Sequence, residues 1–241
     1  MITYTVFTNQ GGREINEDSL IVEEKGGNFC FTLADGLGGH GKGDAASQFV
    51  CRYIGTQFQE TESLENFLQE VYASGQVELN AEKRRLHERG MMTTAVTLLI
   101  ANGMAQWIHM GDSRLYMFRK NKVVLRTVDH SVPQMMVLGG ELREKDIRNH
   151  PDRNKLLKAF GARDTAVECT PGEAVRLEEK QAFLLCSDGF WELILEKEMT
   201  KTLRKSKTVN DWMNAMVEII VKRQSKLNGN ADNFTAIAVW N

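Results

Sequence analysis

Four aspartates of this chain stand at the ends of apolar runs, where their carboxylates could act together. They are Asp35, Asp112, Asp188 and Asp232. The neighbouring runs, such as residues 29–34 and 182–186, have the apolar, β-forming composition of buried strands. A single Asp-Gly pair usually marks only a hairpin turn. Four carboxylates brought together repel one another unless a cation joins them, so the pattern predicts a metal site.

The types of donor indicate which metal this site would take. The aspartates have no His or Cys at the spacing of metal ligands, and hard oxygen ligands favour Mg²⁺ or Mn²⁺ over Zn²⁺. Two such ions about 3.5–4 Å apart, bridged by one carboxylate, can supply a hydroxide nucleophile and clamp a phosphoryl oxygen. Arg13, five residues before Asp18, is a candidate to bind the free oxygens of a phosphate.

Composition excludes several classes of partner. The chain has 241 residues, of which 42% are hydrophobic and 26% charged, as is typical of a soluble globular protein. A formal net charge of −2 gives no electrostatic basis for binding nucleic acid or an anionic membrane, and no apolar run is long enough to span a bilayer. The basic cluster at residues 83–85 is best explained as a solvated helix face. The four widely spaced cysteines predict reduced core residues. We expect one cytoplasmic, monomeric domain over residues 1–241.

Apolar runs between turn residues predict many short strands. They are expected at residues 2–8, 19–23, 28–34, 94–101, 104–110, 113–119, 122–126, 166–170, 173–178, 181–187 and 234–240. Short turns such as Asn102-Gly103 join the four strands from 94 to 126, which predicts an antiparallel meander. Helices are expected at about 44–59 with Asp44 as N-cap, at 63–87 with Ser63 as cap, and as a pair within 190–225. Hairpins interrupted by two pairs of helices favour an α+β fold, in which helices cover antiparallel sheets.

Three weaker motifs predict other chemistries, and the surrounding sequence argues against each. Residues 36–41 match G-x-G-x-x-G, but a long helix follows where a Rossmann unit needs a parallel strand. The same loop approaches a P-loop, yet Gly43 stands where the magnesium-binding hydroxyl belongs. Asp129-His130-Ser131 has the residue types of a hydrolase triad, but three consecutive side chains cannot adopt its geometry. We expect a turn there, before a helix near 132–138.

Seven short motifs occur in the order seen in PP2C-type (PPM family) metal-dependent protein phosphatases, and the chain most resembles the compact bacterial members. The motifs are Arg13-x-x-Asn16-Glu17-Asp18, Ala34-Asp35-Gly36-x-Gly38-Gly39, Thr93-Thr94, Gly111-Asp112-Ser113-Arg114, Asp129-His130-Ser131, Ser187-Asp188-Gly189 and Asp232-Asn233. The resemblance covers essentially the whole chain. It implies a β-sandwich flanked by helices on both faces, and dephosphorylation of phosphoserine and phosphothreonine in proteins.

The resemblance also implies a binding site for two Mn²⁺ or Mg²⁺ ions. Asp35 would bridge both ions and Gly36 would supply a backbone carbonyl, while Asp188 and Asp232 would complete the ligands of the first ion. Asp18 would hold or orient water on the metal, with Glu17 assisting.

Two further residues receive roles from the same resemblance. Asp112, with Asp188, would bind a weaker third ion, and Arg13 would bind the substrate phosphate. A hydroxide that bridges the metals would attack phosphorus in line, without a phosphoenzyme. Residues 139–161 correspond to a flap that contacts the protein substrate, although an exposed helical connector explains their composition as well.

Two positions depart from the family pattern. Leu37 stands where many eukaryotic members have a proton-donating His, so either His40 or water would protonate the leaving oxygen. Met92 stands before Thr93-Thr94 where the family often has Gly, which changes packing without removing a ligand.

The expected substrates are phosphorylated proteins, and the expected partner is an opposing Ser/Thr kinase. One alternative is an active phosphatase dedicated to a single regulatory protein. Another is an inactive binding module, whose signature would be loss of a metal-binding Asp; all four strand-end aspartates are present.

Overall fold

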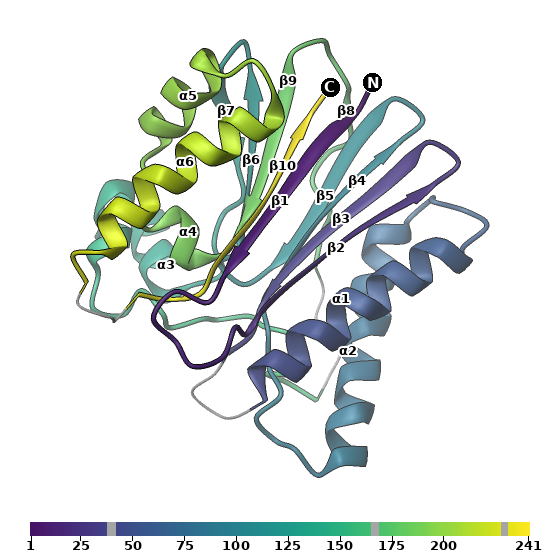
Figure 1. The fold of residues 1–241 in the computed structure, drawn as a ribbon. Coiled ribbons are helices and arrows are strands. Elements are labelled where there is room, and N and C mark those ends of the chain that lie inside the picture. Colours follow the sequence, from purple (N-terminus) through teal and green to yellow (C-terminus); the bar gives the residue numbers. More distant parts are fainter. Residues whose placement is uncertain (38–41, 165–168, 228–230) are drawn as a thin grey trace.

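The computed structural model describes residues 1–37, 42–164, 169–227 and 231–241. These residues form two antiparallel sheets that pack face to face (Figure 1). One sheet has the order β1 (Thr3–Asn9), β10 (Phe234–Trp240), β9 (Gln181–Cys186), β6 (Arg114–Arg119) and β7 (Lys122–Arg126). The other has the order β2 (Asp18–Lys25), β3 (Asn28–Asp35), β4 (Ala95–Ala101), β5 (Met104–Met110) and β8 (Val175–Arg176).

Pairs of helices cover the outer faces of the sandwich, so the predicted α+β architecture is confirmed. Helices α1 (Gly43–Glu60) and α2 (Phe67–Leu86) pack on the sheet that contains β3, and α5 (Glu196–Lys205) and α6 (Val209–Gln224) pack on the sheet that contains β9 (Figure 1). Three shorter helices are α3 (Val132–Leu138), η2 (Glu144–Asn149) and α4 (Asp188–Trp191). The helix expected near 132–138 and the final strand at 234–240 are confirmed.

The central strands are buried on both faces, which explains why their sequences are continuously apolar rather than alternating. In β3, Cys30 and Ala34 join the core beneath α1 and α2, whereas Phe31 and Leu33 join the core between the sheets. Phe183 reaches that same core from the opposite sheet. A strand buried on both faces makes a rigid support for whatever side chain stands at its end.

The predicted meander of four strands is wrong. The hairpins β4–β5 and β6–β7 form as expected, but they lie in different sheets. The chain crosses between the sheets at Gly111, whose φ is +106°. A Cβ at this position would lie 2.6 Å from Thr94 Cγ2, so the crossing requires glycine. Local sequence shows where each strand ends, but not which sheet the next strand joins.

Two predicted helix caps are also wrong. Helix α1 begins at Gly43, so Asp44 lies in its first turn instead of capping it. This start is set by tertiary packing, because a Cβ on Gly36 would lie 2.3 Å from the Gly43 carbonyl oxygen. Helix α2 begins at Phe67, and the Ser63 hydroxyl instead accepts a hydrogen bond from the Glu65 amide in the preceding turn.

Other expectations are met in part. Residues 166–168 of the strand expected at 166–170 lie outside the described residues, and the strand expected at 173–178 is reduced to β8. All four cysteines are buried and free, as predicted. Over the four described segments, every helix is too short or too polar to cross a membrane.

Candidate metal centre

One cavity, of about 520 Å³, collects nearly all of the predicted site residues. Its lining includes Arg13, Glu17, Asp35, Gly36, Asp112, Asp188 and Asp232. These residues come from segments far apart in the sequence and from both sheets. Of the predicted set, only Asp18 lies outside the lining, and it is the strand partner of Asp35. We call this space the carboxylate cavity.

Strands β2 and β3 bring the first two aspartates together. Asp18 begins β2, Asp35 ends β3, and the two face each other in register. The Asp35 amide donates to the Thr94 hydroxyl at 3.1 Å, and the Thr94 amide donates back to the Asp35 carbonyl at 2.8 Å. Asp18 is buried, and its Oδ2 accepts a hydrogen bond from the Ser187 hydroxyl at 2.8 Å. Its Oδ1 is a buried oxygen without a hydrogen-bond partner within the described residues.

The other sheet contributes two more aspartates. Asp188 begins α4 directly after β9, and Asp232 precedes β10. The Ser187 hydroxyl accepts from the Thr235 amide at 3.0 Å, which holds the ends of β9 and β10 together. Asp112 lies buried in the crossing between β5 and β6. The strand ends of both sheets therefore place carboxylates at one end of the sandwich.

Burial and mutual repulsion raise the pKa values of these carboxyl groups. The pKa of Asp188 is raised to about 6, first by burial and then by the charge of Asp232. Burial raises the pKa of Asp18 to about 7, with a contribution from Asp188. The pKa values of Asp35 and Asp112 lie well above the ordinary range for the same two reasons. Such a cluster carries its full negative charge only when cations neutralise it.

The donor set fits hard divalent cations. Its members are carboxylate oxygens, with the Gly36 backbone beside them, and the buried Asp18 Oδ1 has an unused lone pair. Asp232 is already partnered within the protein, because its Oδ2 accepts a hydrogen bond from Arg13. In the parts of the chain that the structure describes, no three acidic, His or Cys side chains already have an arrangement that could hold a metal. Binding would therefore require these side chains to rearrange.

Arg13 lies at the mouth of the carboxylate cavity. Its Nη2 donates to Asp232 Oδ2 at 2.8 Å, and both side chains are partly exposed. This hydrogen bond is the largest cause of a raised pKa for Arg13, so the guanidinium stays charged. Only one nitrogen is engaged, which leaves other N–H donors for a phosphate.

A buried ion pair that the sequence analysis missed lies behind Asp112. Arg114 donates to both carboxylate oxygens of Asp129, at 2.8 and 2.6 Å, and both side chains are buried. Its guanidinium also lies 3.4 Å from the ring centroid of Trp191, whose indole N–H donates to the Asp112 carbonyl at 3.0 Å. This pair therefore supports both the Asp112 backbone and α4, which begins with Asp188. Both residues stand in motifs named in the sequence analysis, but their pairing was not predicted.

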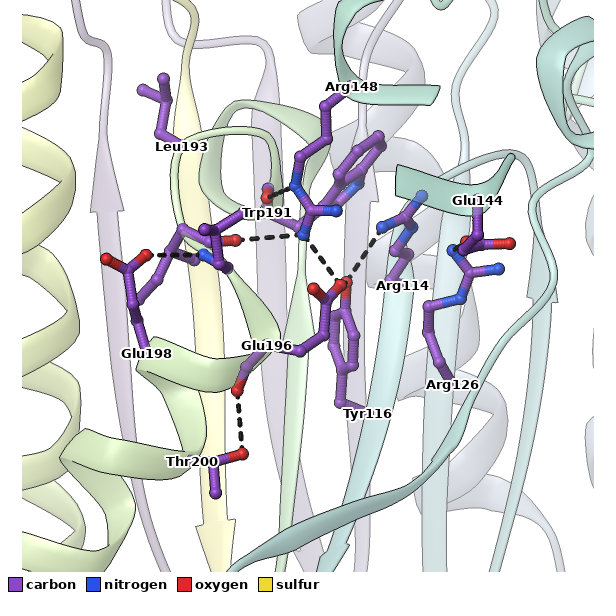
Figure 2. A network of polar contacts seen from close by, with 12 residues as sticks. Arg114, Tyr116, Arg126, Glu144, Arg148, Trp191, Leu193, Glu196, Glu198 and Thr200 are labelled. Atoms are coloured by element: carbon purple, nitrogen blue, oxygen red, sulfur yellow. Dashed lines mark hydrogen bonds and ion pairs between the residues drawn. The ribbon is translucent and has the colours of Figure 1, made fainter. Parts of the chain in front are cut away.

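Arg148 connects the predicted flap, residues 139–161, to the same supporting structure. It donates to the carbonyls of Trp191 and Ile194 and pairs with Glu196 at 2.8 Å (Figure 2). Figure 2 shows Arg148 and Arg114 reaching toward Trp191 from different segments. The later part of the flap, residues 154 and 156–159, lines the carboxylate cavity.

Two other expectations concern the loop after Asp35. Residues 38–41, including His40, lie outside the described residues, so the suggested proton donor has no structural account. The Leu37 amide donates to the Met92 carbonyl at 2.9 Å, and both residues line the carboxylate cavity. Met92 thus shapes the rim of the cavity.

We predict that Asp129→Asn lowers the free energy of unfolding by about 3 kcal/mol, because Arg114 would remain buried without its counter-charge. Urea denaturation of the chelator-treated protein measures this loss. Asp146→Asn is the matched control, since Asp146 pairs with Arg143 on the surface and its loss should cost about 0.5 kcal/mol or less. Equal costs for the two variants would contradict the role given to the buried pair.

We also predict that chelator-treated protein loses stability as the pH rises from about 5 to about 8. The folded-state pKa values of Asp188 and Asp18 are raised to about 6 and about 7, so in this range the folded chain holds protons that the unfolded chain has lost. Removal of those protons as pH rises disfavours the folded state. Asp188→Asn should weaken this dependence and raise the melting temperature at pH 8 by a few degrees. Thermal unfolding followed by circular dichroism tests this, and an unchanged pH profile in the variant would contradict it.

Comparisons with known proteins identify the family. The family model for protein phosphatase 2C matches residues 10–230. The serine/threonine phosphatase stp of Listeria monocytogenes serovar 1/2a is 30% identical over 244 residues, which cover 94% of this chain and 90% of that protein. The protein phosphatase PhpP of Streptococcus pneumoniae is 27% identical, over 98% of this chain and 96% of that protein.

Solved structures agree with this assignment. The serine/threonine phosphatase Stp1 from Staphylococcus aureus has a TM-score of 0.89 and 26% identity, over 100% of this chain and 95% of that chain. The catalytic domain of the phosphatase PstP, in complex with two manganese ions, shares the fold with a TM-score of 0.80 and 24% identity, over 99% of this chain and 97% of that chain. Because the family model spans most of the sequence, this chain belongs to the protein phosphatase 2C family.

Proposed function

We propose that the carboxylate cavity is the active site at which this protein hydrolyses phosphoserine and phosphothreonine in proteins. The observation that carries the proposal is the convergence of aspartates from both sheets on one cavity, with an arginine at its mouth. Membership of the protein phosphatase 2C family supports metal-dependent serine/threonine dephosphorylation as the reaction.

Divalent cations are the cofactors that this donor set and the family support. Asp35, Asp188 and Asp232 would hold two Mn²⁺ or Mg²⁺ ions, together with the carbonyl of Gly36. When bound, such ions lower the pKa of water to supply a nucleophile at neutral pH and neutralise charge on the phosphoryl group. Asp112 would serve a weaker third ion.

The protein's own groups would position the substrate. Ser187 holds Asp18 beside its strand partner Asp35, and the unpartnered Asp18 Oδ1 would accept a hydrogen bond from water that enters the site. The Arg13 guanidinium at the mouth would bind the phosphate through its unused N–H groups. Leu37 offers no proton, so solvent is proposed to protonate the departing serine or threonine oxygen.

The setting of the reaction is also part of this proposal. Substrates would be proteins phosphorylated by a Ser/Thr kinase, which this enzyme would oppose. Four buried free cysteines support a reducing compartment such as the cytoplasm, and we expect the enzyme to act there as a monomer.

The first experiment measures p-nitrophenyl phosphate hydrolysis by chelator-stripped protein, with and without added Mn²⁺ or Mg²⁺. We expect turnover that depends on metal, and a loss of more than about 100-fold in Asp188→Ala because a metal ligand is removed. The same preparations should have native circular dichroism spectra. Absence of turnover with either metal in folded wild-type protein would reject the proposal and favour the inactive binding module.

Arg13→Ala should raise the KM for a phosphopeptide by about tenfold with little change in kcat, because a binding interaction of the phosphate is lost. Steady-state kinetics in saturating metal measure both constants. Arg204→Ala, which removes an exposed arginine at the end of α5 and far from the flap in the sequence, is the control. An unchanged KM in Arg13→Ala would remove Arg13 from phosphate binding while leaving the metal chemistry intact.

A further inference from the structure

A second cavity adjoins the carboxylate cavity and has no part in the chemistry proposed above. It has a volume of about 790 Å³ and lies between the end of α2, the loop after it and residues 161–164. Met92 and Ala162 line both cavities, so a chain lying across this rim would reach from one to the other. We call the second cavity the α2 groove.

The charged residues of the α2 groove are mostly basic. They are Lys83, Arg84, Arg89, Glu88 and Asp164. Lys83 has a structural role, since its Nζ donates to the Gly161 carbonyl. Burial lowers the pKa of Lys83, and the nearby charge of Asp164 partly offsets that effect. Asp164 is therefore close enough to Lys83 to offset part of its charge.

Unlike Lys83, Arg84 and Arg89 have side chains without a structural role in the described part of the groove. Both are exposed, and neither side chain has a hydrogen-bond or ion-pair partner within residues 1–37, 42–164, 169–227 and 231–241. The sequence-based expectation of a solvated helix face accounts for Arg85, which pairs with Glu82 at 2.7 Å on the same helix. It does not account for two unpaired arginines in a groove, with Glu88 as the one remaining acidic group of its lining.

A third arginine extends this positive surface. Arg163 is exposed and unpaired within the described part of the chain. It lines a smaller cavity of about 200 Å³ that shares Leu157 and Ala159 with the carboxylate cavity. Arg84, Arg89 and Arg163 thus stand around the same side of the active-site rim.

Side chains of α2 hold the wall of the α2 groove in place through hydrogen bonds to the backbone of residues 161–163. The Gln76 and Asn80 amides donate to the Arg163 carbonyl at 2.5 and 2.8 Å, and Gln76 Oε1 accepts from the Gly161 amide at 2.9 Å. Gln76 and Asn80 are both buried, so these bonds are shielded from water. The groove is preformed, and a ligand would not need to order it.

We propose that the α2 groove binds acidic residues that flank the phosphorylated serine or threonine of a protein substrate. This inference rests on the proposed phosphatase function, because the adjoining cavity must take the phosphate. The occupant is an acidic peptide segment, since unpaired guanidinium groups bind carboxylates and the groove connects directly to the phosphate site. Each exposed ion pair contributes little and is screened by salt. The preference for substrates with acidic flanking residues should therefore appear as a lower KM, and it should weaken as salt is added.

The test compares three substrates at saturating Mn²⁺. They are p-nitrophenyl phosphate and two phosphothreonine peptides that differ only in carrying Glu or Gln at the flanking positions. The variant is Arg84→Glu/Arg89→Glu, and the matched control is Arg204→Glu/Lys205→Glu at the end of α5, which makes the same change in net charge on the other helical layer. Wild-type protein should prefer the Glu peptide, and the preference should shrink at high salt.

We expect the groove variant to raise KM for the Glu peptide by about tenfold, with less than about twofold change for the Gln peptide and for p-nitrophenyl phosphate. The control variant should leave the ratio of the two peptide KM values unchanged. Equal KM values for the two peptides in wild-type protein, or the same loss in groove and control variants, would overturn the inference. Failure of the wild-type protein to hydrolyse p-nitrophenyl phosphate would instead reject the phosphatase function itself.

Discussion

At one end of the sandwich Asp112 is buried and Asp35 and Asp188 are partly buried, and desolvation and neighbouring negative charge raise the pKa values of all three together. Protons can relieve this repulsion, but a protonated carboxyl group is a poor ligand for a hard cation. Divalent cations relieve this repulsion without protons. The attraction between cation and carboxylates would therefore both bind the metal and stabilise the folded site. Arg13 on Asp232 provides only partial relief at the exposed side of the cluster.

Repelling groups stay together only if their supports are stronger than the repulsion. Strands β3, β9 and β10 are mostly buried, and the ends of β9 and β10 are joined through the Ser187 hydroxyl, which also donates to Asp18. Behind Asp112, the Arg114–Asp129 pair and Trp191 form a polar network whose members satisfy one another in a dry interior. Arg148 extends that support to residues 139–161, so this segment and the segments that carry the clustered aspartates share one scaffold.

Much of the fold and of the site was predictable, because strands buried on both faces leave long apolar runs and the candidate ligands stand where those runs stop. The remainder depends on contacts between distant residues. Asn102-Gly103 correctly predicts a hairpin, but nothing local to Gly111 indicates that the chain changes sheets there. Asp129 was expected in a turn and in a family motif, but its ion pair was not predicted, because packing and not spacing identifies its partner Arg114. The start of α1 is likewise set by the contact between Gly36 and Gly43.

The distribution of charge on the protein likewise depends on which distant residues the fold brings together. A net charge of −2 for the whole chain argues against polyanionic partners. This sum does not show that the fold gathers acidic and basic side chains in different places. Aspartates from both sheets concentrate in one cavity, while Arg84, Arg89 and Arg163 come together beside it from α2, the following loop and the segment after the flap. An acidic segment beside the phosphate would be attracted by these arginines, which lie next to the carboxylate cavity. Such an arrangement would admit the phosphate to the metal site and keep the flanking acidic residues outside it.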